Sequence, residues 1–129
     1  MDPQYLPLVY DRLNAVCFGG RLRPALIRIH PWILSKDSPG ARLAGAWDAE
    51  GWSVGLDRAL LDHPDLLFGV LLHEMVHQDC WQQDRITGHG PLFIAAAAKA
   101  AASLGVQPPT PGTAEMWPEP VPRQLLKEI

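Results

Sequence analysis

The sequence has little of what disulfide-rich, membrane-spanning or nucleic-acid-binding proteins need. It holds two cysteines, Cys17 and Cys80, in 129 residues, too few for a disulfide framework. No apolar run approaches the roughly 20 residues of a transmembrane helix, and the first residues lack the basic and apolar regions of a signal peptide. The net charge is −3, so no overall basic field attracts nucleic acid. We therefore expect a cytoplasmic protein with two free thiols and no membrane partner.

Length and apolar content indicate one globular domain with its own core. Hydrophobic residues make up 47% and charged residues 19% of the chain, as in ordinary globular proteins. We find no internal repeats. Four basic residues near the N-terminus could form a local patch, but we interpret them as part of a solvated surface: Arg12, Arg21, Arg23 and Arg28.

The spacing of apolar residues, glycines and prolines predicts an α+β fold. The expected elements are a helix over 3–18 ended by Gly19 and Gly20, a strand over 25–30, a loop over 35–40, a hairpin of strands 43–48 and 52–56, a turn over 58–61 capped by Asp57, a helix over 65–82, a loop over 85–90, and a helix between Pro91 and Gly105. An N-terminal helix, a small and mostly antiparallel sheet and two further helices follow from this order.

Residues 106–129 differ from the rest of the chain in their proline content. Prolines in the interior of a helix or of a sheet remove backbone hydrogen bonds. Six of them fall within this stretch: Pro108, Pro109, Pro111, Pro118, Pro120 and Pro122. We therefore expect a domain over 1–105 and a proline-rich tail over 106–129 that is extended or disordered.

The segment from His73 to His77 carries the strongest chemical signal, because it reads His-Glu-x-x-His within a predicted helix. Residues four apart lie on one helical face, so both imidazoles can reach one metal ion. Glu74 is offset by one position and does not ligate. It can act as general base toward a water molecule at the metal.

A polar helix face in contact with solvent is the alternative explanation of this motif. The residues around it argue against that alternative, since the helix is almost wholly apolar over 66–76. Burial of two imidazoles and a carboxylate is costly without a partner, and a metal ion is a natural one. We therefore interpret the motif as functional.

A catalytic zinc ion usually has three protein ligands, so a third must come from elsewhere in the chain. The candidates downstream are His89, Glu115 and Glu119. The two glutamates lie in the proline-rich tail, a poor place for a rigid ligand. His89 stands between Gly88 and Gly90, and these glycines allow the backbone to turn the imidazole back toward the helix. We favour His89 over a carboxylate.

Cys80 is another potential ligand near the motif, but it projects from a different part of the helix. We interpret it as a small buried hydrophobic residue.

The metzincin class of metalloproteases is excluded by the residues after the motif. Its pattern requires a glycine and a third histidine where this chain has Cys80 and Gln83.

The motifs together resemble the SprT-like (Spartan-type) metalloprotease domain. The specific elements are the Leu-Leu-His-Glu-Met-Val-His stretch over 71–77 and the Gly-His-Gly-Pro stretch over 88–91. The similarity extends upstream to the phenylalanine-glycine segment over 18–22, to Ala44-Gly45 and to the strand over 54–57, and covers about residues 6–104.

This resemblance implies a zincin-type α+β domain that cleaves proteins, which in the best-known members are crosslinked to DNA. His73, His77 and His89 correspond to the zinc ligands of the family, and Glu74 corresponds to its catalytic glutamate. Many members carry a four-cysteine zinc ribbon or a DNA-binding segment, which this acidic chain lacks. We expect a monomeric zinc metalloprotease with a protein substrate, and leave open whether DNA is a partner.

A zinc-stabilised binding module with a closed or occluded site is the alternative function. A closed site would need a fourth protein ligand. Asp79, Cys80, His63 or a carboxylate of the tail could supply it.

Three tryptophans and two further histidines have ordinary structural explanations. An extended substrate could pair with an edge strand of the hairpin, but we interpret Trp47, Trp52 and Trp81 as core residues rather than cleft residues. His30 and His63 each precede a proline, and we expect both to be surface or capping residues.

Overall fold

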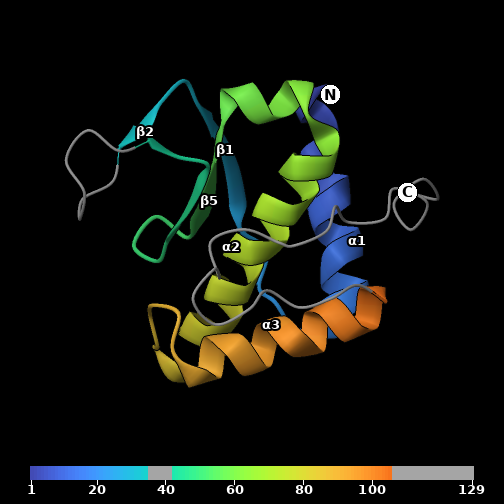
Figure 1. Ribbon diagram of the computed structural model, residues 1–129, viewed down its shortest axis with the longest axis vertical. Coiled ribbons are helices and arrows are strands. Elements are labelled where there is room, and N and C mark those ends of the chain that lie inside the picture. The colour runs from blue at the N-terminus through green and yellow to red at the C-terminus, as the bar shows by residue number, and fades with distance from the viewer. Residues whose placement is uncertain (35–41, 106–129) are drawn as a thin grey trace.

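The computed structural model of the protein describes residues 1–34 and 42–105 (Figure 1). In chain order it contains the 3₁₀ helix η1 (Pro3–Tyr5), helix α1 (Leu6–Phe18), strands β1 (Leu26–His30), β2 (Ile33–Leu34), β3 (Arg42–Leu43), β4 (Gly45–Asp48) and β5 (Ser53–Asp57), the 3₁₀ helix η2 (Arg58–Asp62), and helices α2 (Pro64–Asp84) and α3 (Pro91–Leu104). The fold is α+β, as the sequence predicts. The expected loop over 35–40 and tail over 106–129 lie outside the described residues, so the domain boundary at residue 105 stays a prediction.

The helix ends follow from local backbone chemistry. α1 and α3 end at Gly19 and Gly105, whose φ angles of 61° and 71° lie in the left-handed region that glycine adopts without steric cost. α2 runs to Asp84, two residues further than the sequence predicts, and ends where Arg85 takes a left-handed conformation with φ 57°. Arg85 is not a residue type that signals a helix end, which explains the misplaced boundary.

The strands form a mixed three-stranded sheet in the order β1-β5-β4 and a two-stranded sheet of β2 and β3. β4 and β5 are antiparallel neighbours, as the predicted hairpin requires, with Trp47 opposite Val54. β1 is parallel to β5, with Ile27 opposite Val54. The strand pairs of the described residues are thus mostly antiparallel, as expected. β4 lies at one edge of the larger sheet.

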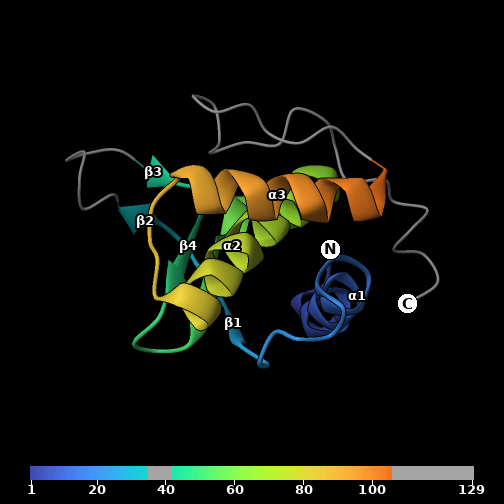
Figure 2. The ribbon, with the colours of Figure 1, turned by 90° about the horizontal axis from the view of Figure 1, so that it is seen from below.

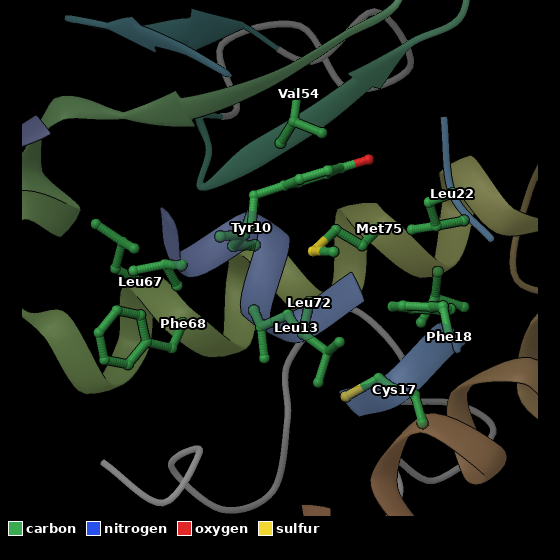
Figure 3. Close-up of a cluster of buried hydrophobic side chains, with 14 of the residues drawn as sticks. Tyr10, Leu13, Cys17, Phe18, Leu22, Val54, Leu67, Phe68, Leu72 and Met75 are labelled. Atoms are coloured by element: carbon green, nitrogen blue, oxygen red, sulfur yellow. The ribbon is translucent and has the colours of Figure 1, made fainter. Parts of the chain in front are cut away.

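Helix α2 runs through the middle of the molecule, between the sheet and α1, and α3 lies across it (Figures 1 and 2). Its apolar residues are fully buried on several sides of the helix: Leu67, Leu71, Leu72, Met75 and Val76. Tyr10 and Leu13 of α1 and Val54 of β5 pack around Leu72 and Met75 (Figure 3). The predicted burial of the motif helix is confirmed.

None of the helices in the two described ranges is long and apolar enough to cross a membrane.

Polar contacts attach the segment after α1 to the same helix. The Tyr10 hydroxyl donates to Oε1 of the fully buried Gln78 at 2.7 Å, and Gln78 Nε2 donates to the carbonyl oxygen of Arg23 at 2.6 Å. One turn further along α2, Gln82 accepts from the Arg23 amide and donates to the Arg21 carbonyl oxygen. These hydrogen bonds fix the position of residues 21–23 relative to α2.

We expect Gln78→Met to destabilise the protein. The substitution keeps the side chain's approximate length but leaves the Arg23 carbonyl and the Tyr10 hydroxyl with fewer partners in the interior, at a cost of about 1–3 kcal/mol. Urea unfolding measures this cost. Gln4→Met is the control, because Gln4 is exposed on η1, and should change the free energy of unfolding by less than about 0.5 kcal/mol. Equal stability of the two variants would contradict the structural role of Gln78.

Candidate metal centre

Helix α2 and the loop that follows it bring three imidazoles together. His73 and His77 lie one turn apart on α2, with His73 buried and His77 partly exposed. The chain then reverses over residues 85–90, where Gly88 has φ 83°. This reversal carries the exposed His89 back to the two helical histidines. The loop lies on the same side of α2 as the sheet (Figure 2).

The distances within this cluster fit a metal ion. His89 Nε2 lies 3.2 Å from His73 Nε2 and 3.1 Å from His77 Nε2, and the ligand atoms of the three residues all lie within 4.8 Å of one another. Zinc–nitrogen bonds of about 2.0–2.1 Å in a tetrahedron separate two ligand nitrogens by about 3.3 Å. Three imidazoles that present their Nε2 atoms at this spacing could hold such an ion.

Burial keeps the two helical imidazoles in the neutral form that binds metal. Desolvation lowers the pKa of His73 to about 4, and the neighbouring His89 lowers it further in the same direction. Desolvation, followed by His73 and His89, lowers the pKa of His77 to about 3. Both rings therefore offer nitrogen lone pairs at neutral pH without having to release a proton first.

Glu74 lies beside this cluster, 5% exposed, on the face of α2 that meets strand β4. Desolvation raises the pKa of its carboxyl group to about 8. A divalent cation close to the carboxyl group opposes that shift, because it favours the charged form. Burial therefore moves the pKa of Glu74 from the usual carboxyl range toward neutral pH, as a general base and acid requires.

Strand β4 approaches Glu74 closely because residue 45 is a glycine. A Cβ atom at Gly45 would lie 2.7 Å from Val70 Cγ1, 3.1 Å from the Gly55 carbonyl oxygen and 3.2 Å from Glu74 Cγ. The first distance is shorter than van der Waals contact allows. The edge strand can therefore lie this close to Glu74 only because residue 45 has no side chain.

The other candidate ligands of the sequence lie apart from the three histidines. Asp79 pairs with Arg21 at 2.9 Å, and burial raises the pKa of the Cys80 thiol to about 11. His63 is the residue before α2, at the opposite end of the helix from His77. In the part of the chain that the structure describes, the metal-ligand cluster consists of His73, His77 and His89 alone. Glu115 and Glu119 lie outside the described residues.

Some expectations for the remaining aromatic residues need correction. His30 is half-buried rather than on the surface, since its ring lies about 3.0–3.2 Å from where a Cβ of Gly55 would stand. Trp47 and Trp52 contact each other edge to face at 5.1 Å, and Trp47 packs partly against the core. Phe93 was not predicted from the sequence as part of the site, although its ring contacts all three imidazoles. Its place two residues after Pro91, directly after the His89 loop, was the available signal.

Comparison with known proteins identifies the family. The model of the SprT-like family matches residues 8–112, which is most of the chain. The chain belongs to the SprT-like family. Among curated proteins, the comparison found none that matches it. In this SprT-like domain, the family match spans the His73–His77 motif, His89 and the strand that carries Gly45.

We expect the burial of Glu74 to make the metal-free wild type lose stability relative to Glu74→Gln as the pH rises. The pKa of Glu74 is about 8 in the folded protein and 4.5 when unperturbed. Between these values the folded state holds a proton that the unfolded state has released, so the free energy of unfolding falls with increasing pH. Urea unfolding with a chelator present should show the wild type losing at least about 1 kcal/mol relative to Glu74→Gln across this range. The comparison cancels the contributions of the histidines, and parallel pH curves would contradict the burial of an ionisable group.

Proposed function

We propose that the protein is a zinc-dependent endopeptidase that hydrolyses peptide bonds of protein substrates. The convergence of the His73, His77 and His89 Nε2 atoms beside the buried Glu74 is the observation that carries this proposal. Three protein ligands leave one position of a tetrahedral zinc ion for a water molecule, as in catalytic rather than structural zinc sites. Membership of the SprT-like family supports the same chemistry.

A zinc ion held by His73, His77 and His89 would supply a nucleophilic water at neutral pH and would polarise the scissile carbonyl group. Glu74 accepts the proton of the attacking water and then delivers it to the amine that leaves. The burial of its carboxyl group serves both steps, because it raises the pKa toward the working pH. His73, His77 and His89 hold their lone pairs toward the common centre throughout.

The edge of the sheet offers a place for the polypeptide that is cut. Within the described residues, β4 pairs on one side with β5 and has no strand on the other. An extended segment can add to such an edge through main-chain hydrogen bonds. Because Gly45 brings β4 against Glu74, a segment bound there lies next to the glutamate. This route requires an extended stretch of protein, which favours unfolded or flexible substrates.

We further propose proteins crosslinked to DNA as a substrate class. We also propose that the peptidase itself acts as a monomer. The acidic net charge of −3 supplies no general attraction to DNA. Cleavage assays should therefore compare a free protein, the same protein crosslinked to DNA, and the free protein with added DNA. If only the protein crosslinked to DNA is cleaved faster, DNA-crosslinked proteins are the preferred substrate class.

Glu74→Gln should keep zinc and lose peptidase activity. The amide cannot accept the proton of the water, so cleavage of casein or of a crosslinked protein should fall by roughly 100-fold or more, while zinc content measured on the same sample stays unchanged. His89→Ala is the complementary control and should lose zinc as well as activity. Cleavage by Glu74→Gln at the wild-type rate would refute the role of Glu74. Zinc retention without cleavage in the wild type would support a zinc-stabilised binding module instead.

Gly45→Ala should slow catalysis without changing zinc affinity. The added methyl group meets Val70 and Glu74, so the strand or the carboxylate must move. A misplaced catalytic group costs roughly 10- to 100-fold in rate. The double variant Gly45→Ala, Val70→Ala should recover part of the activity, because it removes the nearest atom. Gly55→Ala is the matched control, since Gly55 faces away from α2 toward His30. If both alanine variants lost the same activity, the effect would come from the sheet in general.

A further inference from the structure

One phenyl ring lies against all three candidate metal ligands. The ring centroid of Phe93 is 5.0 Å from that of His73, 4.5 Å from that of His77 and 4.9 Å from that of His89. The Phe93 and His89 rings are perpendicular, at 90°, which is the favourable edge-to-face arrangement. In the described part of the chain, no other aromatic ring contacts all three histidines.

The imidazoles have few other contacts that fix their orientation. Metal-binding histidines usually donate their second ring N–H to a carboxylate, a carbonyl group or water. Here His73 Nδ1 is buried and has no hydrogen-bond partner in the described ranges. The side-chain hydrogen bonds of His89 within those ranges go to the other two imidazoles. Within the described ranges, no hydrogen bond to a group outside the histidine cluster therefore orients the side chains of these two rings.

Phe93 is anchored much better than the loop before it. Its side chain is 1% exposed and belongs to the first turn of α3, whose inner face packs into the core through Ala97, Ala100 and Leu104. His89, in contrast, is exposed and lies between two glycines. The rigid helix thus presents a fixed apolar surface to a ligand on a loop of low intrinsic stiffness.

We propose that Phe93 is a positioning residue that holds the three imidazoles in the arrangement that binds the metal ion. Its ring covers one side of the cluster, limits the rotation of each imidazole and excludes water there. It replaces, for His73 and His89, the hydrogen-bonded partners that orient ligands in most metal sites. The contacts of the Phe93 ring are with the metal-ligating imidazoles, so its effect is on metal affinity and coordination geometry.

Zinc affinity of the purified full-length protein tests this role. Competition with a chromophoric chelator should show Phe93→Leu binding zinc roughly 10- to 100-fold more weakly than the wild type, as expected when the support of a ligand is removed. The visible absorption of bound Co²⁺ should lose intensity or shift, because the ligands no longer hold one tetrahedral geometry. Unchanged affinity together with an unchanged Co²⁺ spectrum would overturn the proposal.

Phe18→Leu is the matched control. Phe18 is also 1% exposed, and it packs in the core at the end of α1 (Figure 3). The same loss of a buried ring should lower thermal stability there but leave zinc affinity within about twofold. Equal weakening of zinc binding by both substitutions would show a general stability effect and overturn the proposal.

A second substitution covers the possibility that Phe93→Leu does not fold. Phe93→Met keeps most of the side-chain volume and removes the flat ring. Its zinc-induced increase in melting temperature should be smaller than that of the wild type. An increase equal to that of the wild type would count against the positioning role.

This inference rests on the metal site of the proposed function but not on peptide hydrolysis. If the wild type cleaves no protein while Phe93→Leu weakens zinc binding, the peptidase proposal fails and the role of Phe93 stands. If the wild type cleaves protein and Phe93→Leu binds zinc with wild-type affinity, the reverse holds.

Discussion

Helix α2 is buried on most sides, and each polar group that it carries into the interior needs a partner there. Gln78 and Asp79 find theirs in the segment after α1, through the Arg23 carbonyl oxygen and the Arg21 guanidinium group. These contacts leave little freedom for the helix to rotate or slide. The metal-site residues His73 and Glu74, five positions earlier on α2, are held by the same constraint, because they share the rigid backbone of that helix.

Two neighbouring stretches of the buried helix thus carry different kinds of polar group. Gln78 and Asp79 are satisfied by protein partners, which stabilises the fold. His73 Nδ1 has no hydrogen-bond partner in the described residues. The carboxyl group of Glu74 is desolvated by burial, which raises its pKa. Burial that is left uncompensated within the protein is typical of sites that act on a ligand. The helix therefore combines a structural and a functional polar face on either side of His77.

Most elements of the fold were predictable from local signals, while the relations between distant elements were not. Gly19 and Gly105 marked helix ends because few other residues adopt a positive φ. Arg85 takes the same conformation without any such signal, so the end of α2 was misplaced. β1 and β5 pair in parallel although they are far apart in the chain, and no local pattern specifies such a pairing. The packing of His30 over Gly55 follows from that pairing.

The sequence by itself determined which residue types could bind a metal and where they lie on a helix, because a spacing of four places His73 and His77 on one face. It also determined that His89 could reach them, since the glycines beside it permit a reversal of the chain. Tertiary structure alone decided what surrounds the site. The approach of Gly45 to Glu74 and the packing of Phe93 on the imidazoles of α2 join different elements of the fold. Such contacts depend on how whole elements pack, and no periodicity of the sequence encodes them.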